Sequence, residues 1–194
     1  MKIDLSVPPS SVTLGPAFAE QEARAEALRG LTDPQLRWRP PDGGWSVGQV
    51  LEHLALTHEP YIARLRTALD EGRERARAGR VRRWKPTLLG GMVTRSMTAP
   101  RKVKAAPKFV PGPDVGADAI DRFVATVRSL TGLVGDVDGA DLRVRFTSPV
   151  LSLVRPNLGD AFQLLVVHGD RHLDQIDRVM AAPGFPTASA SGAT

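Results

Sequence analysis

Four segments of the chain carry apolar residues at steps of three and four positions, and this period most restricts the fold. It places the apolar side chains of each segment on one face of an α-helix. Helices with one apolar face bury that face against each other, so the sequence predicts an antiparallel four-helix bundle. The apolar residues of the four segments are, in chain order, Phe18, Ala25 and Leu28; Val47, Val50, Leu51, Leu54, Tyr61, Leu65 and Leu69; Ile120, Phe123, Val124, Val127 and Leu130; and Phe162, Leu165, Val166, Leu173, Ile176 and Met180.

Residue types that begin or end helices set the expected bounds. Pro16 suits a first helical position, and Gly30 is placed to end that first helix. Ser46, three residues before Gln49, has the spacing of a capping box at the start of the second helix. We expect this helix to kink at Pro60, which cannot donate a backbone hydrogen bond. It should end near Gly72, and the third and fourth helices should cover 118–132 and 157–180, with Asn157 capping the fourth.

These bounds give one bundle over residues 16–182. Residues 1–15 are expected to form an extended lead-in, and residues 183–194 a disordered tail. The connections after the second and third helices are long, so the topology can differ from simple up-down-up-down. The first of them, 73–117, is rich in proline and glycine. Two stretches in the connections could be ordered: 88–97 as a short helix, and 141–151 as a short strand or extended loop.

Composition excludes several classes of protein. The chain has no cysteine, so it has no disulfide, no cysteine nucleophile and no thiolate metal site. No apolar run reaches the roughly 18 residues of a membrane span. The N-terminus lacks the apolar stretch of a secretory signal, so we expect a cytoplasmic protein.

Positive charge is concentrated in one segment. The net charge is +5, but residues 73–108 carry twelve Lys and Arg and a single acid, Glu74, so this segment is +11 and the remainder is −6. The segment is either a solvated connector or a patch for phosphate, nucleic acid or acidic partners. With only Trp84 and Phe109 near it, it lacks the interleaved aromatic residues of a single-strand binder.

The four histidines suggest a metal site. His168 and His172 stand four residues apart, so their rings lie one turn apart on one helix face, and His53 lies at the edge of the second helix's apolar face. If these two helices are neighbours, three imidazoles converge and leave a coordination position open, as catalysis at a divalent metal requires. The alternative is that they are structural histidines. His58 lies roughly 140° around the helix from His53, so we interpret it as structural.

Two motifs extend this interpretation. They are Trp45-Ser46-Val47-x-x-Val50-Leu51-x-His53-Leu54 and His168-x-x-Arg171-His172-x-x-Gln175-Ile176. Together they resemble the DinB-like superfamily of four-helix bundles, over about Phe18 to Met180. The resemblance implies that His53, His168 and His172 bind the metal.

The resemblance also implies a class of reaction. Characterised relatives include metal-dependent transferases that use low-molecular-weight thiols such as bacillithiol and mycothiol. A metal lowers the pKa of such a thiol and holds the thiolate near an electrophile. A chain without cysteine fits this chemistry, because the sulfur comes from a cosubstrate. Hydrolysis of a small-molecule substrate is the variant with water as nucleophile. Imidazole ligands favour zinc or nickel, and also accept iron and copper.

Other residues near the motifs are candidates for second contacts. Arg171 matches a family position and could form an ion pair with the second helix or hold an acidic substrate. Gln175 and Tyr61 could line a pocket, while Trp45 is expected to pack at the start of the second helix. Carboxylates that could accept a hydrogen bond from a ligand histidine are Glu52, Asp170 and Asp174.

Two other functions stay open at this stage. The chain could be a non-catalytic metal-binding or stress-linked module, which would leave no accessible fourth coordination position. It could also bind nucleic acid through residues 73–108, with affinity that falls steeply with salt. Exposed apolar helix faces would permit a homodimer.

Overall fold

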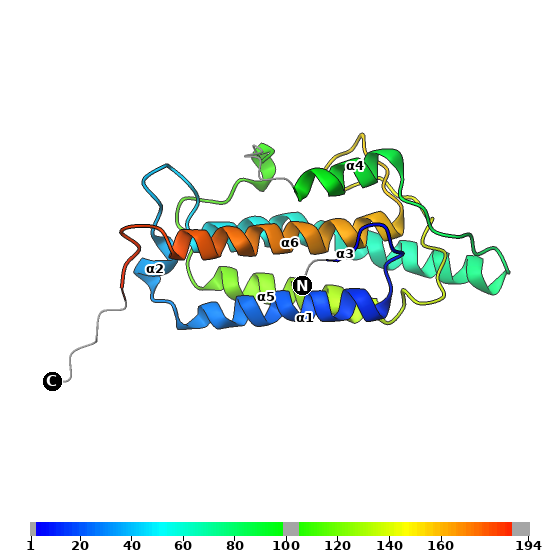
Figure 1. Cartoon of the computed structure of the whole chain (residues 1–194), viewed down its shortest axis with the longest axis horizontal. Helices are drawn as coiled ribbons and strands as arrows, with labels where there is room; N and C mark the ends of the chain where they lie inside the picture. The colour runs from blue at the N-terminus through cyan, green and yellow to red at the C-terminus, as the bar shows by residue number, and fades with distance from the viewer. Residues whose placement is uncertain (1–2, 99–104, 188–194) are drawn as a thin grey trace.

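A computed structural model describes residues 3–98 and 105–187, and its regular secondary structure in those ranges is helical. Figure 1 shows the long helices side by side, with shorter helices in the connections. The all-α prediction is confirmed. The long helices are α1 (Ser11–Ala27), α3 (Val47–Arg77), α5 (Asp118–Val134) and α6 (Leu158–Met180); the short elements are the 3-10 turn η1 (Leu28–Gly30), α2 (Asp33–Arg37), α4 (Leu88–Met97) and the 3-10 turn η2 (Pro107–Phe109).

The four long helices are not arranged in simple chain order. Both α1 and α3 pack against α5 and against α6. The consecutive helices α1 and α3 therefore occupy opposite corners of the bundle, as do α5 and α6. This arrangement makes α3 and α6 neighbours. Within the described ranges, none of the helices combines the length and apolar character that crossing a membrane requires.

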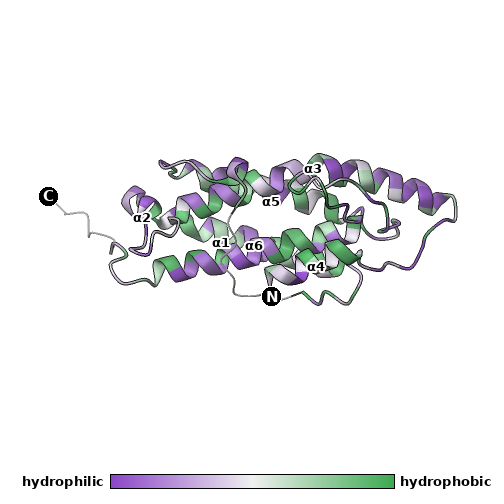
Figure 2. Ribbon diagram, turned by 90° about the horizontal axis from the view of Figure 1, so that it is seen from above, coloured by the Kyte–Doolittle hydropathy of each residue, from purple (hydrophilic) through white to green (hydrophobic). Residues whose placement is uncertain are grey.

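Apolar faces of the long helices meet in one core. Its largest fully buried side chains include Phe18, Phe123 and Phe162. Burying one such side chain stabilises a fold by about 1.5–3 kcal/mol. Figure 2 shows hydrophobic and hydrophilic residues alternating around the long helices, as expected for helices with one face in the core.

Predicted capping residues begin two of the helices. The Ser46 side chain accepts a hydrogen bond from the Gln49 backbone, and the Gln49 side chain accepts one from the Ser46 backbone. Asn157 and Asp160 form the same reciprocal pair at the start of α6. The short helix expected over 88–97 is α4.

Helix α1 begins earlier than predicted. Its first residue is Ser11, so the lead-in ends before residue 15 and Pro16 lies inside the helix. The Ser10 backbone donates to the Thr13 hydroxyl, which supplies a cap that the sequence analysis overlooked. Pro16 removes only the bond to the carbonyl of Val12, whose side chain is 78% exposed.

Helix α3 ends later than predicted. It continues through Pro60 and past Gly72 to Arg77; the kink at Pro60 stays a prediction. Gly72 lies inside the helix, where it allows close packing against the backbone of Asp141. The backbone of Asp141 donates to the Gly72 carbonyl at 3.0 Å, and a Cβ at position 72 would lie 3.1 Å from the Asp141 carbonyl oxygen.

The long connections and the tail are more ordered than expected. Residues 141–151 form an extended loop, with one isolated bridge between Arg145 and Asn157. The expectation of a disordered tail is wrong for residues 183–187, because Phe185 packs edge-on against Trp38. The rest of that tail, 188–194, lies outside the described residues.

The basic segment is not a free connector where it is described. Trp84 is buried, and its indole N–H donates to the Asn157 side chain at 3.1 Å. The Asn157 amide donates to the Lys85 carbonyl, and the Thr87 backbone and hydroxyl donate to the Asp160 carboxylate. These bonds attach the segment to the start of α6. Arg101, Lys102 and Lys104 lie outside the described residues.

Candidate metal centre

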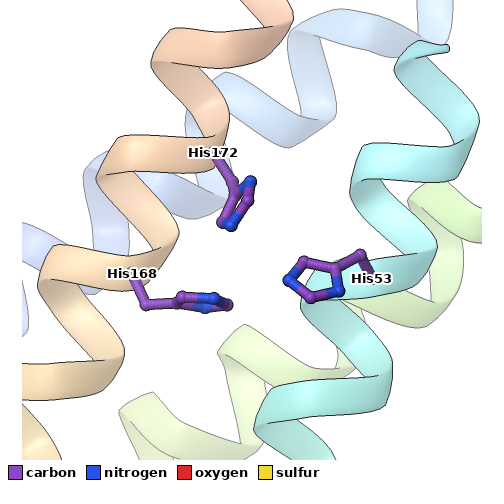
Figure 3. A group of neighbouring side chains, drawn as sticks. All are labelled: His53, His168 and His172. Carbon is purple, nitrogen blue, oxygen red and sulfur yellow. The ribbon is translucent and has the colours of Figure 1, made fainter. Parts of the chain in front are cut away.

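The contact between α3 and α6 brings three histidines together. His53 comes from α3, and His168 and His172 come from α6 (Figure 3). One ring nitrogen of each lies within 4.8 Å of those of the other two. The ring centroids are 4.6 Å apart for His168 and His172, and 4.8 and 5.3 Å apart for His53 with His172 and with His168.

Hydrogen bonds fix which nitrogen two of these rings present. Nδ1 of His53 lies 2.8 Å from the carbonyl oxygen of Phe109, and Nδ1 of His172 lies 2.9 Å from Oε1 of Gln175. Both oxygens accept, so both Nδ1 atoms carry the proton. Each Nε2 then holds a free lone pair, which is the arrangement that metal-binding histidines adopt.

The third ring is oriented by His58. His58 Nε2 lies 3.0 Å from His168 Nδ1, and the His58 side chain is fully buried. The interpretation of His58 as structural stays a prediction, and the structure adds a contact with the cluster that the sequence analysis did not foresee. His58 does not face His53, but it contacts the cluster through His168 of α6. Its place was readable from the sequence, because Leu54, His58 and Leu65 share one face of α3.

This contact decides which ring nitrogen of His58 carries the proton when His168 binds a metal. For His168 to present Nε2 as a lone pair, its Nδ1 carries the proton and donates to His58 Nε2. The proton of His58 is then on Nδ1, which has no hydrogen-bond partner in the described ranges. An unpaired buried donor costs about 1–3 kcal/mol. Metal binding therefore selects a His58 tautomer that the surroundings do not favour.

Burial keeps the cluster neutral. Desolvation is the main cause that lowers the pKa of His58 and of His172 to about 3, and it also lowers the pKa values of His53 and His168. Neighbouring imidazoles lower the pKa values of His58, His168 and His172 further. A neutral imidazole is the form that binds metal, so a cation need not displace protons at pH 7.

This set of donors fits one divalent cation. Zn–N bonds of about 2.0–2.1 Å place tetrahedral ligand nitrogens about 3.3 Å apart, so small side-chain rotations would close the 4.8 Å spacing. No carboxylate joins the set among residues 3–98 and 105–187. The three acids considered from the sequence bond elsewhere: Glu52 to Arg122, Asp170 to Gln21, and Asp174 to Arg24. Three neutral nitrogens suit zinc or nickel.

The other candidate residues lie at different distances from the histidines. Gln175 contacts His172, as described above. Arg171 donates to the carbonyl of Met97 at 3.0 Å, which ties α6 to the end of α4. Tyr61 is not brought to the cluster. Its buried hydroxyl bonds to Ser148 at 2.8 Å, two turns or about 12 Å along α3 from His53.

The three rings of the cluster belong to residues that differ in exposure. His53 is 5% exposed, whereas His168 and His172 are partly exposed. The half-buried indole of Trp45 lies beside His53, with ring centroids 4.8 Å apart. The Trp45 ring therefore packs beside the least exposed of the three histidines.

Comparisons with known proteins agree with this architecture. A family model described as the DinB superfamily matches residues 17–176. The chain is similar in structure to YfiT from Bacillus subtilis, described as a probable metal-dependent hydrolase with an unusual four-helix bundle topology. That similarity has a TM-score of 0.57 and 20% sequence identity, and covers 93% of this chain and 92% of that one. At this identity it shows the fold alone. No protein with curated function matches the chain.

Proposed function

The chain belongs to the DinB superfamily, and we propose that it is an enzyme in which His53, His168 and His172 bind one divalent cation. The observation that carries this proposal is that Nδ1 of each of these three rings has a hydrogen-bond partner, which leaves Nε2 of each ring free to bind a cation. A bound cation would supply a Lewis acid that lowers the pKa of a thiol or a water at its open position.

The surrounding residues position the reactants. Phe109, His58 and Gln175 hold the three rings by their Nδ1 atoms, so the ligand geometry is set before a substrate arrives. The Trp45 indole offers an apolar surface beside the site, against which the carbon skeleton of a small substrate can pack. The partial exposure of His168 and His172 supports catalysis over the non-catalytic metal-binding alternative.

We favour transfer to a low-molecular-weight thiol over hydrolysis. In this reaction the thiolate sulfur forms a bond to an electrophilic carbon of the substrate, and the bond to the leaving group breaks. Because the chain has no cysteine, the sulfur would come from a cosubstrate such as mycothiol or bacillithiol. Hydrolysis is the second candidate, because the structural neighbour is described as a probable metal-dependent hydrolase. A cytoplasmic location and a homodimer stay predictions.

Elemental analysis tests the metal site. Protein purified without an affinity tag or chelator should carry about one equivalent of zinc or nickel, and the His168→Ala variant should carry none. Tyr61→Phe is the matched control, because its hydroxyl lies two turns from the histidines; it should keep the metal. A wild-type chain that holds no metal after reconstitution with either ion would show that the proposal is wrong.

Activity assays then separate the two reactions. The metal-loaded protein is mixed with a thiol and 1-chloro-2,4-dinitrobenzene, and in parallel with a p-nitrophenyl ester alone. A transferase accelerates the first reaction, and a hydrolase the second. In either case His168→Ala should reduce the rate to the uncatalysed level. A fully loaded protein that accelerates neither reaction would favour the non-catalytic alternative.

A further inference from the structure

A concave site lies at the opposite end of α3 from the histidines. It has a volume of about 370 Å³, and Arg75, Arg82, Lys85, Arg143, Arg145 and Asn157 line it. We call it the basic pocket. Along α3, Arg75 lies about 33 Å from His53 at 1.5 Å per residue. The distal end of α3, beside this pocket, is mainly hydrophilic in Figure 2.

Most of the cations in the basic pocket form no ion pair. Arg75 pairs with Glu71 and with the buried Asp141. In the part of the chain that the structure describes, no carboxylate lies within ion-pair distance of the other four, which are Arg82, Lys85, Arg143 and Arg145. The Asp160 carboxylate interacts with Arg145 at longer range. Like charges gathered in a concavity repel each other and create a strong positive potential. An anion in the pocket would relieve this repulsion.

The walls of the basic pocket are fixed by hydrogen bonds. Arg145 and Asn157 form a backbone bridge, and the Leu158 backbone donates to the Val144 carbonyl at 2.8 Å. The Asn157 side chain accepts from Trp84 and donates to the Lys85 carbonyl. The cations therefore come from three separate segments that the fold holds together.

We infer that the basic pocket binds an oligophosphate, either free or as the di- or triphosphate group of a small molecule. Arginine presents a planar fork of donors that matches phosphate oxygens. The volume falls in the range of about 300–1,000 Å³ that is typical of small-ligand sites. None of the residues that line the basic pocket in the described part of the chain is aromatic. Trp84, which bonds to Asn157, is 7% exposed with its N–H engaged, so it offers no face for stacking bases. This favours a compact anion over nucleic acid.

Calorimetric titration with tripolyphosphate tests this inference. The wild-type chain should bind one equivalent, more tightly than pyrophosphate or orthophosphate, and more weakly as salt rises. A variant with Arg143→Gln and Arg145→Gln should bind at least tenfold more weakly. The matched control carries Arg64→Gln and Arg66→Gln, two exposed arginines of α3 outside the pocket, and should bind as the wild type does. Metal content should be unchanged in both variants, so the result does not depend on the proposed function.

Three results would overturn the inference. Equal weakening in both double variants would show that net charge alone attracts the anion. Citrate binding as tightly as tripolyphosphate would show a general counter-ion site. A twelve-nucleotide RNA that binds more tightly than tripolyphosphate would assign the pocket to nucleic acid. Nucleotide triphosphates and tripolyphosphate that compete with equal affinity would identify the phosphates as the recognised group.

Discussion

At the scale of single residues, three different acceptors orient the candidate ligands. The backbone carbonyl oxygen of Phe109 and the side-chain oxygen Oε1 of Gln175 hold His53 and His172, and neither oxygen can donate a hydrogen bond. The imidazole of His58 differs, because its Nε2 can donate or accept. His58 therefore decides whether His168 presents a lone pair, and it acts on the metal only through His168.

This role predicts the effect of substitution at position 58. His58→Phe removes the acceptor for His168 Nδ1 and should weaken zinc binding about 10- to 100-fold, the usual effect of losing such a partner. His58→Gln keeps an oxygen near the position of Nε2 and should bind zinc within a few-fold of the wild type. Competition with a chromophoric chelator measures both affinities. Equal affinity in all three proteins would show that His58 only fills space.

The residues of the site differ in how far the sequence reveals them. The spacing of His168 and His172, and the place of His53 beside an apolar face, predicted that these rings meet. Their role as metal ligands stays a prediction. The carbonyl of Phe109 could not be predicted, because every residue has one and a distant loop delivers it. The contact of His58 with His168 was not foreseen, because the angle of His58 was measured against His53 and not against the neighbouring helix.

At the scale of elements, small residues set how closely segments approach. A Cβ at Gly48 would lie 2.6 Å from the Val115 carbonyl oxygen, so the start of α3 packs directly on backbone before α5. Gly132 in α5 is the opposite case, because a Cβ there would meet nothing within 4 Å.

These two glycines should respond oppositely to alanine. Gly48→Ala forces backbone apart and should lower the free energy of unfolding by about 1–3 kcal/mol. Gly132→Ala replaces an exposed helical glycine and should raise it by about 0.5–1 kcal/mol. Urea unfolding followed by circular dichroism measures both changes. A Gly48→Ala protein as stable as Gly132→Ala would contradict the close packing of α3 on Val115.

Helix starts were predictable where a local capping pair marks them, as at Ser46 and Asn157. The start of α1 was missed, since Pro16 is a stronger signal than the pair of Ser10 and Thr13. The attachment of the basic segment to α6 was not predictable. It depends on Trp84 meeting Asn157, which is 73 residues away.

At the scale of the whole molecule, the diagonal placement of α1 and α3 makes α3 and α6 neighbours, and their contact buries His53 and His58 and partly buries His168 and His172. This burial makes the stability of the fold depend on pH. In the native chain, His58 and His172 have pKa values of about 3, whereas an unfolded histidine has a pKa of about 6.5. Between these values the unfolded chain binds more protons, so stability is lost as the pH falls below 6.5.

Metal-free protein should therefore lose about 2 kcal/mol for each of these two histidines between pH 7.5 and pH 5.0. Burial raises the pKa of Asp160 and Asp170, so the native chain binds more protons there and this opposes part of the loss at the acid end. Urea unfolding at several pH values measures the dependence. His58→Phe should flatten it by about 2 kcal/mol, while Gly132→Ala should shift the curve without changing its slope. A free energy of unfolding that is constant over this range would show that the histidines are not buried as neutral rings.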